Sequence, residues 1–210
     1  MRKVMLLLLI FFASAFFTLQ GEEYDFRQTR WGMSVKEVRS SERSSLLRKE
    51  GGKKEYRLTY SASIADMEGR IVYLFSEYNL RKAWYSFPIE ESGQAVEKYW
   101  YLKKILTEKY GPPEHSKRTY SEGKKKEFGP FSFLLMLPLN LRLGGSLEKG
   151  QLVLETVWAT DFTYITLLAE KKEERYSVSV RYEHKRYADD RSRDEEEKRA
   201  LEEKELLDAL

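Results

Sequence analysis

The 210-residue sequence contains no cysteine and only two histidines. Without cysteine the chain can form neither a disulfide nor the thioether bond of a bacterial lipid anchor, and it has no thiolate to offer a metal. The two histidines, His115 and His184, lie far apart in the sequence and form no cluster at metal-ligand spacing. Packing alone therefore has to hold the folded protein together, and we expect neither a metal nor another cofactor.

Catalytic motifs are absent from the sequence as well. There is no nucleophile elbow and no phosphate-binding glycine-rich loop, and Gly51-Gly52 and Gly144-Gly145 are plain breaks in the pattern. A Ser-His-Asp triad assembles only in three dimensions, so a hydrolase of an unrecognised type stays open as a third interpretation, which requires a histidine beside a serine and a carboxylate. We expect a protein that is not an enzyme.

The long apolar run at the N-terminus predicts export. Met1-Arg2-Lys3 precedes apolar residues from Val4 to Leu19, and Ala13-Ser14-Ala15 fits the small-x-small rule for cleavage. These features predict a signal peptide over residues 1–21; the competing interpretation is an uncleaved anchor, for which the run is short. We expect an exported protein, periplasmic or envelope-associated and not lipid-anchored.

Aromatic residues are plentiful, with 14 Tyr, 11 Phe and 4 Trp, which favours a folded protein over a disordered one. The formal net charge is +3, although residues 185–210 contain seven basic and ten acidic residues. The mildly basic remainder of the chain favours an acidic partner but does not indicate nucleic-acid binding.

The opening segment has the features of a helix start. Ser34 and Glu37 form a capping box, in which each side chain satisfies the other residue's backbone amide. Trp31 is large enough to anchor the preceding turn in a core. We expect a helix from Ser34 to about Leu47–Lys49.

Alternating patterns predict an antiparallel meander after this helix, and the same order then repeats. A helix over Ser92–Tyr110 ends at a Gly-Pro-Pro break. The fold class is therefore α+β, with two tandem units, each a helix packed on a three- to four-stranded antiparallel meander, over residues 22–90 and 91–184. The predicted strands are Tyr56–Ile64, Arg70–Glu77, Leu80–Phe87 (ended by Pro88), part of His115–Glu127, Gln151–Thr160, Phe162–Glu170 and Arg175–His184, with turns at Asp66–Gly69 and Tyr78-Asn79.

An apolar insertion over residues 128–145 interrupts the second unit. Alternation from Leu137 to Leu143, with Pro138 inside it, predicts an edge strand or a loop over a sheet face. It either covers the core or forms an exposed patch that contacts a partner or a membrane surface, together with the neighbouring lysines. The candidate contact residues are Phe131, Phe133, Leu135, Leu137, Lys124, Lys125 and Lys126, with Lys117 and Arg118 nearby.

Residues 185–210 form a highly charged tail. A second capping box at Ser192 and Glu195 predicts a helix. Such a helix is either a solvated tail or a docking element.

The segment Gly32-Met33-Ser34-Val35-Lys36-Glu37-Val38 resembles the Gly-Met-Ser/Thr-x-x-Gln/Glu-Val motif of small outer-membrane assembly lipoproteins of the SmpA/OmlA type. The order of a helix and an antiparallel meander is similar to that family and to the tandem-repeat β-lactamase inhibitor proteins, and Tyr110-Gly111-Pro112-Pro113 resembles the family's Gly-x-Pro after a helix. Phe26 to Val38 also resembles exported bacterial proteins of unknown function. The chain departs from the lipoproteins in lacking a lipobox cysteine and in lacking Gly-x-Pro in its first unit.

These observations predict a non-enzymatic, exported envelope protein that binds another protein through an aromatic-rich sheet face. The alternative is a peripheral membrane-associated protein held by the apolar 131–137 segment and its lysines. We expect an envelope protein as the partner, with a membrane surface as the alternative and no nucleic acid.

Overall fold

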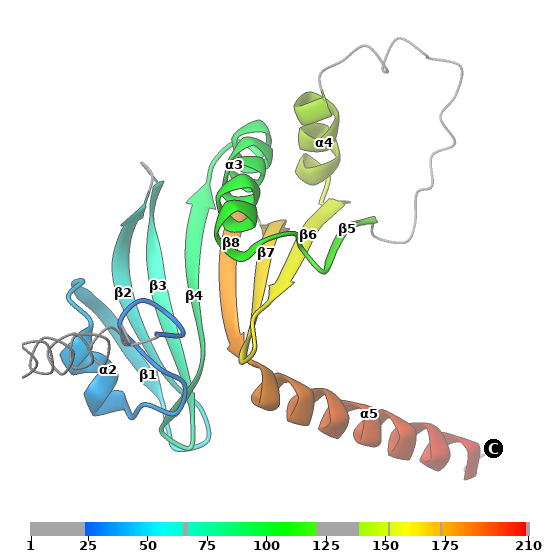
Figure 1. The fold of residues 1–210 in the computed structure, drawn as a ribbon. Helices are drawn as coiled ribbons and strands as arrows, with labels where there is room; N and C mark the ends of the chain where they lie inside the picture. The colour runs from blue at the N-terminus through cyan, green and yellow to red at the C-terminus, as the bar shows by residue number, and fades with distance from the viewer. Residues whose placement is uncertain (1–23, 65–66, 121–138, 151, 173, 209–210) are drawn as a thin grey trace, which may run out of the picture.

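The computed structural model describes residues 24–64, 67–120, 139–150, 152–172 and 174–208 (Figure 1). The predicted signal peptide over 1–21 and the greater part of the apolar insertion, 128–138, lie outside the described residues. The elements are α2 (Val35–Ser41), β1 (Leu46–Gly51), β2 (Tyr56–Ile64), β3 (Met67–Ser76), β4 (Asn79–Ile89), α3 (Ser92–Tyr110), β5 (His115–Tyr120), α4 (Leu139–Glu148), β6 (Leu152–Ala159), β7 (Thr163–Lys172), β8 (Arg175–His184) and α5 (Lys185–Asp208).

The eight described strands form one antiparallel sheet in the order β1-β2-β3-β4-β8-β7-β6-β5. In each half the strands that follow one another in sequence are paired, and the halves meet where β4 pairs with β8. The last strand of one unit therefore pairs with the last strand of the other. The predicted α+β class is confirmed: two repeats of four antiparallel strands, each with its helix, share one sheet, and α5 follows.

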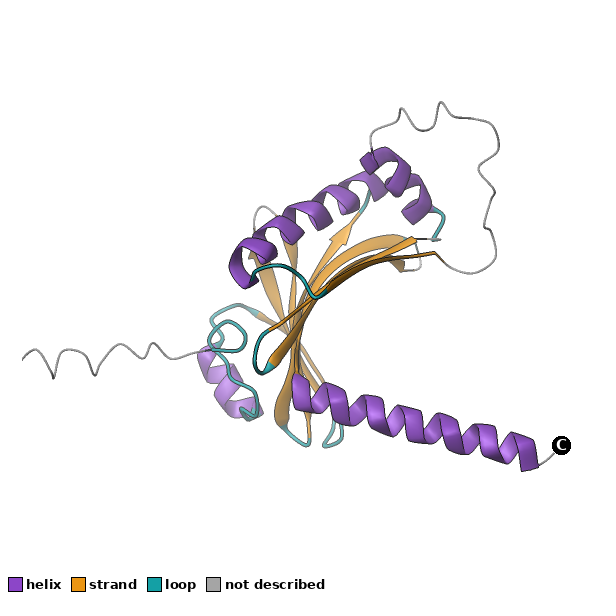
Figure 2. Ribbon diagram, turned by 45° about the vertical axis from the view of Figure 1, so that its right-hand side comes forward, coloured by secondary structure: helices purple, strands orange, loops and turns teal. Residues whose placement is uncertain are grey.

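The helices α3 and α4 cover one face of this sheet (Figure 2). The core on this face contains a buried row that crosses six strands, and burying each large side chain of this kind contributes about 1.5–3 kcal/mol. Two hydrogen bonds fix α3 on the sheet: Tyr99 OH lies 2.6 Å from Thr156 Oγ1, and Trp158 Nε1 donates to the carbonyl oxygen of Gly111 over 3.1 Å. The row consists of Leu58, Tyr73, Ala83, Tyr182, Ile165 and Trp158.

The predicted capping box is present at the start of α2. Ser34 Oγ accepts from the Glu37 amide, and the Glu37 carboxylate accepts from the Ser34 amide over 2.7 Å. Trp31 is half-buried against the core, and its Nε1 donates to Thr163 Oγ1 over 2.8 Å. Because Thr163 belongs to β7, the opening segment of the first unit is tied to the second.

We expect Ser34→Ala to lower the free energy of unfolding by about 1 kcal/mol, because it removes the hydroxyl that caps α2. Chemical denaturation followed by tryptophan fluorescence measures this value. Ser40→Ala is the matched control, because the Ser40 hydroxyl donates to the Lys36 carbonyl inside the helix and caps no amide. Equal losses from both substitutions would contradict a capping role.

The predicted extent of the first helix is wrong. The helix ends at Ser41, and Leu46–Gly51 forms β1, paired with β2. The cause is local, since the Glu42 carboxylate accepts from the Ser44 amide over 2.8 Å and turns the chain away from the helix.

Three predicted boundaries also differ from the structure. Gly69, predicted to lie in a turn, lies inside β3. The tight turn predicted at Tyr78-Asn79 consists of Glu77 and Tyr78, both with positive φ. Pro88 lies inside β4, where it pairs with β8. The pairing of β4 with β3 reaches only Ser86 on that side, so the missing amide of Pro88 costs no ladder hydrogen bond with β3.

Two further predictions need correction as well. Leu139 to Leu143, predicted as an edge strand or loop, belong to the helix α4, and Leu143 is buried. The helix α5 begins at Lys185, immediately after β8, so Ser192 is an interior residue and not a cap.

Candidate interaction surface

The residues predicted to contact a partner or a membrane lie outside the described residues. This holds for Lys124, Lys125 and Lys126 and for Phe131, Phe133, Leu135 and Leu137. Of the basic residues near them, Lys117 and Arg118 are described, and both are exposed on β5. The role assigned to this segment stays a prediction.

The aromatic-rich face of the sheet is the covered face, which corrects the expectation that it forms the recognition surface. Tyr73, Phe75 and Phe87 are buried, and the ring of Phe26 packs 5.5 Å from that of Tyr73 and 5.0 Å from that of Tyr182. These side chains form the core. Of the two faces of the sheet, the opposite one is open to a partner.

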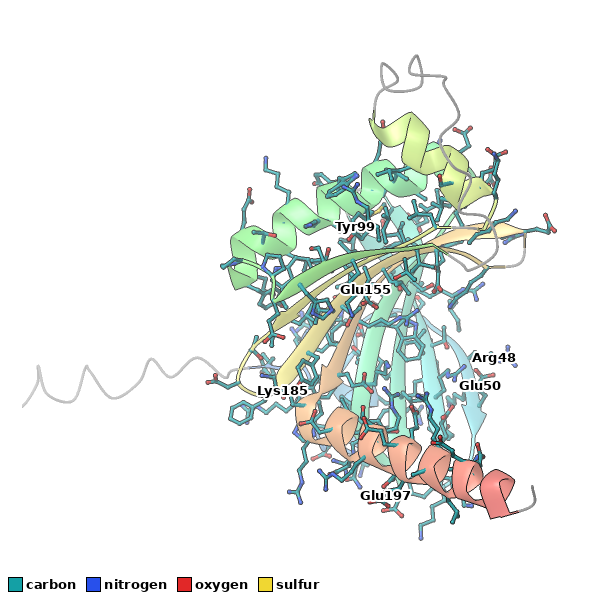
Figure 3. The ribbon with its side chains drawn as sticks, turned by 90° about the vertical axis from the view of Figure 1, so that its right-hand side faces the viewer. Arg48, Glu50, Tyr99, Glu155, Lys185 and Glu197 are labelled. Atoms are coloured by element: carbon teal, nitrogen blue, oxygen red, sulfur yellow. The ribbon has the colours of Figure 1, made fainter. Side chains whose placement is uncertain are left out.

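That opposite face is concave, and the described helices leave it open except where α5 starts at one end (Figure 2). In Figure 3, Tyr99 lies on the helix side of the sheet and Glu155 on the concave side. We call this surface the concave face and define it by the cross-strand row that runs through all eight strands: Arg48, Thr59, Val72, Trp84, Arg181, Thr166, Val157 and His115.

Trp84 lies at the centre of the concave face, on one of the two middle strands. It is half-buried and lies opposite Val72 on β3 and Arg181 on β8. The guanidinium carbon of Arg57 lies 5.8 Å from the centre of its ring. Tryptophan and arginine are the side chains most enriched where proteins bind one another tightly.

Ion pairs surround Trp84. Lys82 Nζ lies 3.1 Å from Glu183, which also binds Arg191 of α5 over 3.2 Å. Arg181 binds Glu170 over 3.0 Å. Burial lowers the pKa of Lys82, although the charge of Glu183 opposes this effect. The charges next to Trp84 therefore already have partners, and they hold the rim of the surface in a fixed arrangement.

Neither a cluster of metal ligands nor a Ser-His-Asp triad forms among the described residues. No group of three or more His, Asp or Glu side chains among them could hold a metal ion. His115 Nε2 lies 3.7 Å from Glu155, and His184 Nδ1 is buried without a hydrogen-bond partner in this part of the chain. Within the same residues, neither histidine hydrogen-bonds to a serine, so the geometry that a triad requires is not formed there.

A surface pocket of about 320 Å³ lies elsewhere, between the N-terminal turn and the end of α2. Three of the lining residues bind one another: the Glu42 carboxylate accepts from Tyr73 OH over 2.6 Å and pairs with Arg27 over 3.0 Å. The side chain of Glu42 is only 1% exposed. This network fastens the N-terminal turn to the sheet, and the charges of Glu42 and Arg27 already neutralise each other there.

Trp84 is not among the residues predicted to contact a partner, although the sequence contains a signal for it. In the predicted strand Leu80–Phe87, Ala83, Tyr85 and Phe87 follow a period of two, and Trp84 is out of phase with them. The period places Trp84 on the wet face, where a large aromatic residue is unusual.

None of the described helices is both long enough and apolar enough to cross a membrane. No protein-family model matches the chain, and neither the curated proteins nor the solved structures contain a significant match to it. The resemblance to the outer-membrane assembly lipoproteins and to the β-lactamase inhibitor proteins therefore stays a prediction.

Proposed function

We propose that this chain is a non-enzymatic, exported module of the bacterial envelope that binds another protein through the concave face. The observation that carries the proposal is Trp84, half-buried between Arg57 and Arg181 at the centre of a sheet face that the described helices leave open. The signal-like N-terminus supports the location.

The physical basis is desolvation of a rigid, amphipathic surface. A partner that covers Trp84 removes its ring from water, and the surrounding ion pairs form a polar rim that excludes solvent. The sheet fixes the backbone, so little conformational entropy is lost on binding. The charges in the rim occur as pairs of opposite sign, which favours a partner surface of mixed charge.

Site-specific photocrosslinking tests this proposal. A photoreactive phenylalanine replaces Ser86, two residues from Trp84 on the same face, and the protein is irradiated in an envelope extract of the organism that encodes it. The matched control carries the same group at Tyr101, an exposed position on α3. We expect one discrete protein adduct from position 86 and none from position 101.

The substitution Trp84→Ala provides the second arm of the test. We expect it to weaken capture at least ten-fold, the effect of losing about 1.4 kcal/mol or more at a central aromatic contact. Tyr101→Ala should leave capture unchanged. Adducts of equal yield from both positions, or adducts with lipid alone, would contradict the proposal, and lipid adducts would favour the membrane-associated alternative.

A further inference from the structure

The strand β5 forms one free edge of the described sheet. It pairs with β6 through six consecutive residue pairs, from His115 opposite Val157 to Tyr120 opposite Leu152, and no described strand pairs with its other side (Figure 1). At the opposite edge, the pairing of β1 with β2 shifts register between Leu46 and Arg48. A bulge of that kind protects an edge against further pairing, whereas the regular β5 leaves its backbone groups available for another strand.

Cations flank β5 on the helix side of the sheet. Lys103 Nζ lies 5.1 Å from the centre of the Trp100 ring, and the guanidinium carbon of Arg118 lies 5.9 Å from it. Lys103 also donates to Ser116 Oγ on β5 over 2.9 Å. Within the described residues, no carboxylate lies within ion-pair distance of Lys103 or Arg118. We call Trp100, Lys103, Ser116 and Arg118 the basic cluster.

The basic cluster is held in place from below. Ser116 Oγ lies 2.9 Å from Thr156 Oγ1, which lies 2.6 Å from Tyr99 OH, and Thr156 and Tyr99 are buried. This chain of hydroxyl groups fixes Ser116 and, through it, the ammonium group of Lys103. Burial lowers the pKa of Lys103, and repulsion by the nearby charge of Arg118 lowers it further. No described carboxylate lies between the two cations to offset this repulsion.

We propose that β5 binds an extended, acidic segment of a partner protein, which adds to the sheet as a ninth strand and places carboxylate side chains against Lys103 and Arg118. Successive side chains of a strand point to opposite faces, so every second residue of the added strand faces the basic cluster. Carboxylates at these positions neutralise the cations, whereas neutral or basic segments leave Lys103 and Arg118 unpaired. The charge of the edge thus selects which strand can pair with it.

This inference goes beyond the proposed function, because it concerns the sheet edge and does not depend on binding at the concave face. The probe is a six-residue peptide with glutamate at alternate positions and threonine between them. Its first control has the same sequence with N-methyl groups on alternate backbone amides, which keeps the charge and removes the hydrogen bonds of strand pairing. Its second control has lysine in place of glutamate.

Binding to the full chain is measured by titration calorimetry, and the location by protection of the β5 amides from hydrogen exchange. We expect the glutamate peptide to bind and to protect β5, and the N-methylated and lysine peptides to bind at least ten-fold more weakly. The double variant Lys103→Gln, Arg118→Gln should lose at least ten-fold in affinity. The matched control Lys104→Gln, at an exposed site on α3 paired with Glu108, should bind as the unmodified chain does.

Four results would overturn the inference: no binding of the glutamate peptide, equal binding of the N-methylated peptide, equal binding by the double variant, or protection of β1 in place of β5. The failure of this proposal is distinguishable from a failure of the proposed function. Trp84→Ala should leave peptide binding unchanged, and the double variant should leave crosslinking from position 86 unchanged.

Discussion

Replacing Gly69 by valine is expected to lower the free energy of unfolding by about 3 kcal/mol, because the structure has no room for a side chain at this position. A Cβ atom there would lie 2.5 Å from the carbonyl oxygen of Ser86 and 2.6 Å from the ring of Phe87. Phe87 is itself buried in the core, so neither neighbour can move away freely. For a chain of this length the melting temperature should fall by about 6–12 °C, as measured by calorimetry.

The control for this prediction is Gly93→Val. Gly93 lies in the first turn of α3, and a Cβ atom there meets no other atom within 4 Å. Valine is a slightly better helix residue than glycine, so this variant should keep or slightly raise the melting temperature. A similar loss in both variants would mean that the close packing of β3, β4 and Phe87 is not the cause.

Much of the fold could be predicted because local patterns determine local elements. The alternation from Tyr56 to Ile64 and from Tyr176 to Tyr182 gives strands with one buried face, and both strands form as predicted. The capping box at Ser34 and Glu37 fixes the start of α2 in the same way. In each case the residues that decide the structure lie within a few positions of one another.

The parts that could not be predicted depend on contacts between distant residues. The Glu42 carboxylate that turns the chain at the end of α2 is itself held by Arg27 and Tyr73, which lie 15 and 31 positions away. Gly69 is required because Phe87 packs over it on the next strand. The pairing of β4 with β8, which joins the two units into one sheet, leaves no local pattern in either strand.

The two candidate surfaces likewise depend partly on local patterns and partly on contacts between distant residues. The alternation in β4 placed Trp84 on the wet face, but only the joined sheet puts it at the centre of a concave surface beside Arg181. The sequence showed Arg118 as part of a basic stretch, yet its proximity to Lys103 and Trp100 depends on α3 packing beside β5. Composition can indicate a kind of surface, and topology decides where it lies.

The second large effect is expected for Glu42→Gln, which should lower the free energy of unfolding by about 2 kcal/mol at neutral pH. The carboxylate is buried and accepts from Tyr73 OH and the Ser44 amide while pairing with Arg27. Removing one partner of a buried ion pair typically costs about 3–5 kcal/mol. Arg27 is partly exposed to solvent, which screens the pair and makes the loss smaller. Urea denaturation measures the difference, with Glu55→Gln as the control at an exposed residue paired with Arg57.

The pH dependence of this difference identifies its cause. Burial acts to raise the pKa of Glu42, but the hydrogen bonds from Tyr73 and Ser44 and the charge of Arg27 outweigh it, so the folded-state pKa lies below the ordinary value of 4.5. A carboxyl group with a lowered pKa contributes stability above that ordinary value, and this contribution is lost as the pH falls through the folded-state pKa. The difference in the free energy of unfolding between wild type and Glu42→Gln should therefore be constant near neutral pH and become smaller as the pH drops below about 4.5. The lowered pKa of His184 affects both proteins equally and cancels in the difference. If this difference stays unchanged down to strongly acidic pH, the loss of stability in Glu42→Gln comes from side-chain packing and not from the charge of Glu42.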